Sequence, residues 1–252
     1  EENVRIQIAA FTDLGVRHGE PSEPPTEPQL ERARWRHRHF VEHDPEGSWT
    51  ATIDGKPIGC GMALRRDGLW GLSLLVVDPT AQSGGAGRKL LDATLTYAEG
   101  CERAIILSST DPRAIRSYAT SGFALFPQVS ATGKPALDTA PTSVGRVRVG
   151  GPDDHALADE IDRGVRGAGR GQDHAPISGS AEMYVVDDRD GRGYAYLRDG
   201  TMYLLAATDE ATATALLWRC LLRTGELDVT AGVDHMTGEQ QWAIDTCFAA
   251  RL

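Results

Sequence analysis

The sequence predicts a mixed α/β fold (α+β, with a mixed sheet) that is present twice in tandem. The chain has 252 residues, enough for two domains of about 100–150 residues each. An Arg-Asp-Gly turn followed by an apolar strand occurs at residues 66–68 and again at 198–200, within a similar order of elements. Between the copies, residues 127–143 are rich in Pro, Ala, Thr, Ser and Gly. We therefore expect one domain at 1–143 and a second, degenerate copy at 144–252.

The first half begins with an alternating apolar and polar stretch, Val4–Ala10, which predicts a short strand. Four prolines and three glutamates over Gly19–Pro28 predict an exposed loop. The remaining elements follow from helical spacing, apolar runs and the Asp54-Gly55 turn signal. We expect a helix at 30–43, a hairpin of 48–53 with 57–65, a buried strand at 69–77, a helix at 87–98, a buried strand at 104–107 and a helix at 112–121 that ends at Gly122.

The second half repeats this order in outline. We expect a strand from Val147, a helix after Pro152, a hairpin of 182–186 with 194–197, a strand ending at Leu205, a helix at 210–223, a strand at 227–231 and a helix at 239–252. The sequence stops inside or just after that helix, so the second copy is expected to lack its final strands.

The composition restricts the class of partner and compartment. Twenty-six basic and 36 acidic residues give a formal net charge of −10, which repels phosphate backbones and anionic bilayers. We expect no nucleic-acid and no membrane partner, and a homo-oligomer is left open. Four widely spaced cysteines predict free thiols. With no apolar run of about 20 residues and no signal peptide at the start, a cytoplasmic protein is expected.

The chemistry concentrates in residues 75–91, where an apolar strand, a proline, a glycine-rich turn and a helix start follow one another. Gln82, Gly85 and Gly87 fit the pattern Gln-x-x-Gly-x-Gly. Such a turn presents backbone N–H groups at a helix N-terminus, where they and the helix dipole favour a phosphate. Glycine lets a pyrophosphate approach the backbone closely. Arg88 and Lys89 add positive charge.

Two other phosphate-binding motifs are excluded at this turn. A P-loop requires Ser or Thr after Lys89, and a dinucleotide fingerprint requires a third glycine at position 90; Leu90 fails both. An ordinary strand–helix connection remains the alternative.

A second segment, Asp111–Phe123, places Tyr118 on a short helix just before Gly122-Phe123. Taken with residues 75–91 and the intervening helix and strand, this order resembles the GNAT superfamily of acyl-coenzyme-A-dependent N-acetyltransferases. The resemblance covers the whole N-terminal half in element order, with the motif matches confined to these two segments.

The resemblance implies a site and a reaction. The strand at Leu75–Val77 splays from its neighbour at a bulge, and its backbone holds the pantetheine arm and polarises the thioester. Tyr118 protonates the leaving thiolate after direct attack by the amine of a small molecule or peptide. The implied residues for acetyl-CoA are Leu75, Val76, Val77, Gln82, Ser83, Gly84, Gly85, Ala86, Gly87, Arg88 and Asp111. Asp111 departs from the Asn that the superfamily often has there, and a purely packing role is the alternative for Tyr118.

The general base has no clear candidate; Glu42, His43 and Asp67 are chosen by position alone. We expect no metal site, because no carboxylate or cysteine completes a ligand set with His37, His39 and His43.

The second half lacks the glycine turn and carries Asp209-Glu210 at the matching helix start, where negative charge repels a pyrophosphate. We expect this half to be structural. Tandem arrangements occur in the superfamily, including the mycothiol synthase type. Two classes remain: an N-acetyltransferase, or an acyl-CoA-binding sensor or pseudoenzyme without turnover.

Overall fold

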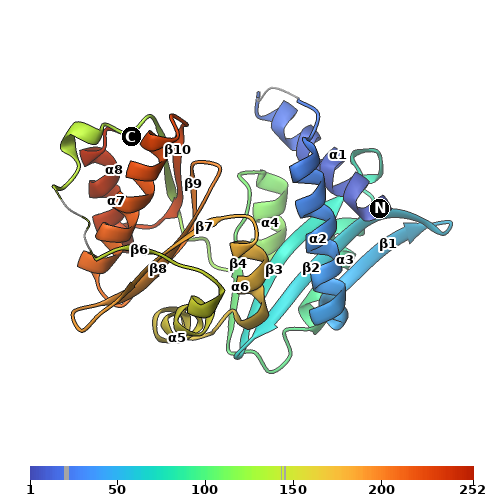
Figure 1. Ribbon diagram of the computed structural model, residues 1–252. Coiled ribbons are helices and arrows are strands. Elements are labelled where there is room, and N and C mark those ends of the chain that lie inside the picture. Colours follow the sequence, from blue (N-terminus) through green and yellow to red (C-terminus); the bar gives the residue numbers. More distant parts are fainter. Residues whose placement is uncertain (20–22, 143, 145) are drawn as a thin grey trace. The chain divides into compact units, whose positions relative to one another are not determined.

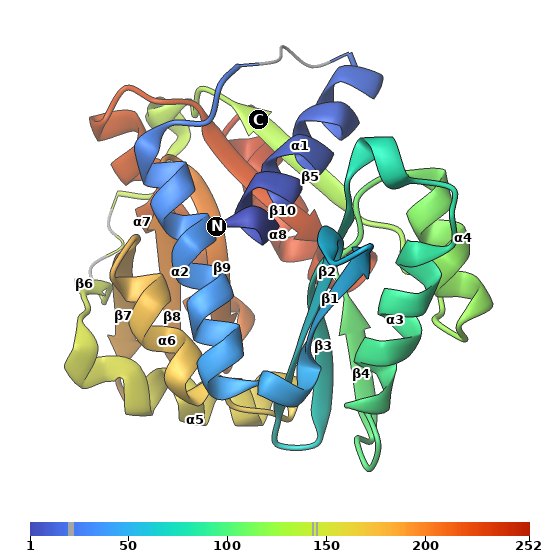
Figure 2. The same ribbon diagram turned by 90° about the vertical axis from the view of Figure 1, so that its right-hand side faces the viewer.

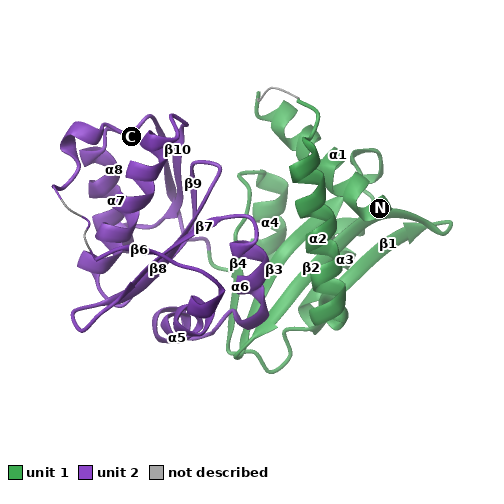
Figure 3. Ribbon diagram, in the orientation of Figure 1, with its two compact units in different colours: residues 1–124 green, residues 125–252 purple. Residues whose placement is uncertain are grey.

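The computed structural model describes residues 1–19, 23–142, 144 and 146–252. The chain forms two compact units, Glu1–Ala124 and Leu125–Leu252 (Figures 1 and 3). Both are mixed α/β units, which confirms the predicted fold class. No helix within the described ranges is long and apolar enough to cross a membrane.

The boundary between the units lies at 124/125, whereas the sequence placed it at 143/144; residue 143 is outside the described residues. Strand β5 (Val129–Gly133) pairs antiparallel with β10 (Ala231–Met236), a strand of the second unit. The backbone hydrogen bonds of this segment are thus satisfied in the second sheet. The composition of the segment carries no signal for the sheet that β5 joins.

The first unit contains one four-stranded sheet in the order β1-β2-β3-β4. The first three strands are antiparallel neighbours, and β4 runs parallel to β3. Its elements are α1 (Glu2–Arg17), α2 (Glu27–His43), β1 (Ser48–Ile53), β2 (Lys56–Arg66), β3 (Leu69–Val77), α3 (Ala86–Thr96), β4 (Arg103–Ile106) and α4 (Pro112–Thr120).

The N-terminal segment is a helix, and the predicted strand at Val4–Ala10 is wrong. A short alternating stretch is compatible with the period of a strand or of a helix, but its buried contacts follow the helical period. Ile6 is fully buried in a hydrophobic cluster, and Ala10, one helical turn later, packs against the same cluster. The tertiary contact with β2 and β3 decides for a helix.

The other predicted elements of the first unit are present with shifts of a few residues. The helix at 30–43 begins earlier, at Glu27, with Thr26 in a capping box with Gln29. The hairpin turns at Asp54-Gly55, where both residues have positive φ. Strand β4, predicted to be buried, is largely exposed because it forms the sheet edge; Ile105 is 50% exposed.

Helices cover both faces of this sheet (Figure 2). Residues of α1 and α2 form one hydrophobic cluster with β2 and β3. Helix α3 packs on the opposite face, against glycines of β2. A Cβ atom at Gly61 would lie 2.9 Å from the Thr94 methyl group, so close helix–sheet packing requires glycine there.

The second unit contains a six-stranded sheet in the order β5-β10-β9-β8-β7-β6, in which only β9 and β10 are parallel. Helices α5 and α6 pack beside one hydrophobic cluster, and α7 and α8 beside others. Its remaining elements are β6 (Arg148–Val149), α5 (His155–Arg166), α6 (His174–Ser178), β7 (Glu182–Asp187), β8 (Arg192–Arg198), β9 (Thr201–Ala207), α7 (Glu210–Glu226) and α8 (Gln241–Ala249).

The predicted duplication is visible in the details of strand pairing. In the first unit the register of β2 with β3 shifts beside Ser73, and in the second that of β8 with β9 shifts beside Tyr203. The strand predicted at 227–231 begins only at Ala231, because Asp228 has positive φ and belongs to a turn.

Candidate acyl-coenzyme-A site

Strands β3 and β4 pair over only four residues and then separate. The ladder runs from Leu69 with Arg103 to Leu72 with Ile106. Strand β3 continues to Val77, still paired with β2 on its other side. The register shift beside Ser73 adds a residue at the point of separation, which bends the strand. The result is the splayed strand that the resemblance implied.

The strand pairing determines which backbone groups face the splay. The Asp78 N–H donates to the Ile58 carbonyl across the β2–β3 ladder, at 2.8 Å. Because hydrogen-bonded pairs alternate in an antiparallel ladder, Val76 directs its backbone groups to β2, whereas Leu75 and Val77 direct theirs away from it. Of the three predicted strand residues, Leu75 and Val77 therefore present backbone groups that do not pair with β2.

The predicted pyrophosphate turn comes directly after β3. A short 3₁₀ turn, Pro79–Ala81, leads into Gln82, and α3 begins at Ala86. Ser83 and Gly85 both have positive φ, so the chain reverses sharply before the helix. Gly85 is the N-cap residue and has no side chain to satisfy the first N–H groups of α3. This leaves them to a ligand or to solvent.

The glycines of the turn face open space. A Cβ atom added at Gly87 would meet only the Val77 side chain, at 3.7 Å, and one at Gly84 only the Ala81 carbonyl, also at 3.7 Å. Both have ordinary φ, so neither sterics nor backbone geometry of the fold requires glycine at these two positions. Glycine at both positions leaves the backbone accessible to close approach from outside.

The charges around the turn are arranged in pairs. Arg88 forms an exposed ion pair with Asp92, one helical turn further on. Arg113 of α4 donates to the Gln82 side chain at 2.9 Å, and Gln82 in turn donates to the Val77 carbonyl at 3.3 Å. Arg113 was not predicted, because nothing in the local sequence distinguishes it from other surface arginines.

Asp111 lies at the N-cap of α4, where its carboxylate accepts from the Arg113 backbone N–H. It also forms ion pairs with the Arg113 and Arg17 guanidinium groups, at 2.9 and 3.1 Å. These partners, Arg113 first, hold the pKa of Asp111 well below its ordinary value. Asp111 is therefore a permanently charged carboxylate that organises two arginines.

Tyr118 lies in the last turns of α4, partly buried. Burial, and then the negative charge of Asp111, raise the pKa of Tyr118 above its ordinary value of 10. The hydroxyl makes no hydrogen bond to another described residue. Tyr118 is thus a protonated phenol whose donor is available.

The three positional candidates for a general base lie at the other end of the sheet. Asp67 is in the turn before β3, and the strand from Leu69 to Val77 alone adds about 26 Å of extended chain between Asp67 and Val77. Glu42 and His43 directly precede Asp44. The Asp44 carboxylate binds Arg66, which pairs with the first residue of β3. The structure therefore does not bring them to the splay. His18, at the end of α1, lies within 3.4 Å of the Thr110 hydroxyl beside Asp111.

The histidines of α2 are packing groups. Burial lowers the pKa of His37 to about 4, and this side chain contacts Gln7 at 3.1 Å. The His39 ring stacks on Trp35 and meets His43 edge-on, each at 4.5 Å between ring centroids. Among the described residues there is no group of three or more His, Cys, Asp or Glu side chains arranged for a metal ion.

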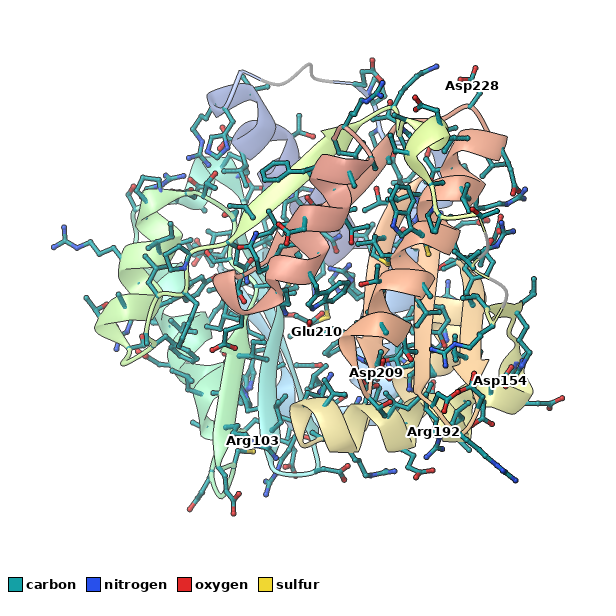
Figure 4. All side chains as sticks on the ribbon, turned by 90° about the vertical axis from the view of Figure 1, so that its left-hand side faces the viewer. Arg103, Asp154, Arg192, Asp209, Glu210 and Asp228 are labelled. Atoms are coloured by element: carbon teal, nitrogen blue, oxygen red, sulfur yellow. The ribbon has the colours of Figure 1, made fainter. Side chains whose placement is uncertain are left out.

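The second unit repeats the splay but not the turn. Strands β9 and β10 pair only at Thr201 and Met202, and β9 continues to Ala207. Asp209 then caps α7 directly, accepting from the Thr212 N–H and hydroxyl at 2.8 and 2.7 Å (Figure 4). A carboxylate of the chain itself occupies the anion-binding end of this helix.

Comparisons with known proteins agree with this geometry. Residues 16–123 match the model of the acetyltransferase (GNAT) family. The sequence matches no curated protein. A protein from Pyrococcus horikoshii, for which acetyltransferase activity has been suggested, superposes with a TM-score of 0.72 at 15% identity, over 99% of this chain and 80% of that one.

Two further structures have the same fold. A tandem GNAT protein from the clavulanic acid biosynthesis pathway has a TM-score of 0.55 at 15% identity, covering 97% of this chain and 90% of that one. A GCN5-related N-acetyltransferase from Kribbella flavida has a TM-score of 0.59 at 17% identity, covering 92% of this chain and 60% of that one. At these identities the likeness is one of fold.

The splayed strand, the glycine turn and the duplicated sheet together define a tandem acyltransferase-type fold. The first unit matches the GNAT family model over residues 16–123, and the chain as a whole has the fold of a tandem GNAT protein.

Proposed function

We propose that this protein is an acetyl-CoA-dependent N-acetyltransferase that moves an acetyl group to a primary amine of a small molecule or peptide. One observation carries the proposal: the outward-facing backbone of Leu75 and Val77 runs directly into a glycine turn at the start of a helix. A strand edge suits the two amides of a pantetheine arm, and the helix start suits a pyrophosphate.

The donor supplies an activated thioester when it is bound. The chain's own groups then position and polarise it. The turn from Gln82 to Arg88 holds the pyrophosphate through the first N–H groups of α3, and Gly84 and Gly87 leave room for it. Backbone N–H groups of β3 stabilise negative charge on the carbonyl oxygen when the amine attacks.

Tyr118 is the proposed proton donor. Direct attack of the amine on the thioester carbonyl forms the amide and breaks the carbon–sulfur bond, and the thiolate leaves with the electron pair. The Tyr118 hydroxyl, held protonated by its raised pKa, gives a proton to that thiolate; the nitrogen releases one to solvent, and the Tyr118 phenolate takes one up from solvent.

Calorimetric titration with acetyl-CoA tests the cofactor site, with Gly87→Leu as the informative variant. A Cβ atom at position 87 makes only an ordinary contact, with the Val77 side chain at 3.7 Å, so the variant is expected to fold and yet lose at least about tenfold in affinity, because the leucine occupies the ligand's path. Gly164→Leu is the matched control, since Gly164 is also helical and faces open space, but in α5 of the second unit.

Failure of the wild type to bind acetyl-CoA would sink the proposal, and so would undiminished binding by Gly87→Leu. Binding without acetylation across a panel of primary amines would identify an acyl-CoA sensor instead.

A further inference from the structure

A continuous chain of hydrogen bonds links α1 to β3. The Arg17 guanidinium donates to Asp111 at 3.1 Å, and Asp111 accepts two side-chain hydrogen bonds from Arg113, at 3.3 and 2.9 Å. Arg113 Nη1 donates to Gln82 at 2.9 Å, and the Gln82 amide donates to the Val77 carbonyl at 3.3 Å. Five groups from four parts of the first unit are thereby held in one network.

This network crosses the splay. Asp111 and Arg113 begin α4, which comes after β4, whereas Gln82 and Val77 belong to the β3 side. The Arg113–Gln82 hydrogen bond thus links the start of α4 to the turn after β3. It ends on the Val77 carbonyl, one of the two backbone positions directed into the splay.

One guanidinium group of the network is exposed beside the turn. The side chain of Asp111 is 11% exposed and faces two guanidinium groups, and Arg17 is also paired with Asp13, at 3.0 Å, so the charges of the network balance. The Arg113 side chain is 54% exposed and directs Nη1 towards the turn. Guanidinium groups bind phosphate oxygens with paired, charge-assisted hydrogen bonds.

We infer that Arg113 is a pyrophosphate-binding residue of the acyl-donor site and that Asp111 positions it. The inference rests on the proposed function. A pantetheine amide that donates to the Val77 carbonyl competes with the Gln82 side chain for the same acceptor. Displacing Gln82 releases Arg113 Nη1 for a phosphate oxygen, while the bonds to Asp111 keep the guanidinium in place.

This role accounts for an aspartate at position 111. A neutral amide has one acceptor oxygen and no charge, so it cannot accept from two nitrogens of the Arg113 guanidinium through two oxygens. The carboxylate does so and caps α4 at the same time.

The test compares three donors that differ in their phosphates: acetyl-CoA, acetyl-dephospho-CoA and S-acetylpantetheine. Calorimetry on the full chain measures their dissociation constants for the wild type, Arg113→Ala and Asp111→Asn. We expect Arg113→Ala to raise the dissociation constants of acetyl-CoA and of acetyl-dephospho-CoA by a similar factor, about 10–100-fold. The dissociation constant of S-acetylpantetheine should stay within about twofold of the wild-type value. Arg116→Ala is the control, because it removes the same charge from an exposed position on the same helix. It should leave the dissociation constants of all three donors unchanged.

Asp111→Asn separates positioning from simple repulsion. If the carboxylate positions Arg113, its loss weakens the binding of acetyl-CoA by about three- to tenfold and leaves the binding of S-acetylpantetheine unchanged. If it merely repels phosphate, its loss strengthens acetyl-CoA binding, which would overturn the role given to Asp111.

The remaining outcomes are decisive for Arg113. If Arg113→Ala lowers the affinity for all three donors equally, its effect is structural. If it lowers the affinity for acetyl-CoA alone, Arg113 lies at the 3′-phosphate. Either result overturns the pyrophosphate assignment. Unchanged binding by Arg113→Ala overturns the inference but leaves the proposed function standing. Failure of the wild type to bind any donor defeats both.

Discussion

Single residues of the first unit divide into those that a motif can indicate and those that only contacts reveal. Gln82, Gly85 and Tyr118 stand in recognisable patterns. Arg17 and Arg113 do not, because their side chains contact Asp111 and Gln82, which are 94 and 31 positions away from them in the sequence. Local sequence cannot show a contact of that separation.

Replacement of Tyr118 by Phe tests the proton donor. We expect kcat to fall by about 100-fold or more with little change in KM for acetyl-CoA, because the phenol acts only as the thiolate leaves. Steady-state kinetics with an accepted amine measures this. An unchanged kcat would return Tyr118 to a packing role.

The pH profile of the wild type gives a second measure of the same residue. A general acid works in its protonated form, so activity due to Tyr118 is present below its pKa and disappears as pH rises through it. Since burial raises that pKa above its ordinary value of 10, the midpoint of the alkaline loss in kcat should lie above pH 10. A loss near neutral pH would assign it to another group.

At the scale of elements, one buried ion pair joins the end of α2 to β2. Both Asp44 oxygens accept from the Arg66 guanidinium, at 2.7 and 2.8 Å, and the Tyr97 hydroxyl donates to the same carboxylate at 3.2 Å. The Asp44 side chain is fully buried. The pair fixes the junction between the helical layer and the sheet.

Asp44→Ala is expected to destabilise the protein by about 3–5 kcal/mol, because it leaves the Arg66 charge buried without its partner. Urea denaturation measures the change. Asp92→Ala, which breaks an ion pair whose members are about half exposed, should cost no more than about 1 kcal/mol. Equal effects of the two changes would contradict this account.

At the scale of the whole molecule, the two units share a splay but differ in the connection from the splayed strand to the next helix. Leu205 and Ala207 correspond to Leu75 and Val77, since the Thr208 N–H donates to the Arg192 carbonyl as Asp78 does to Ile58. The strand is thus duplicated in register. Only two residues then separate β9 from α7, and one of them is the capping Asp209.

We therefore expect one acetyl-CoA per chain. Asp209→Asn removes the repelling charge and keeps an N-cap residue of similar strength but creates no glycine turn, so the stoichiometry should remain one. Isothermal titration gives the stoichiometry directly. A stoichiometry of two, of which Gly87→Leu removes only one site, would show that the second unit binds acetyl-CoA as well.

The sequence alone determined the features that depend on short-range pattern: the helices and hairpins with strong periodicity, the duplication, the glycine turn and the absence of that turn from the second half. These follow from local propensity and from residue types that a turn requires.

Tertiary structure decided the features that depend on distant partners. It made Val4–Ala10 helical, assigned β5 to the second sheet, left β4 at an edge and brought Arg113 to Gln82. In each case two conformations or locations satisfied the local sequence about equally. The choice came from burial and hydrogen bonding between segments far apart in the chain, which no local pattern contains.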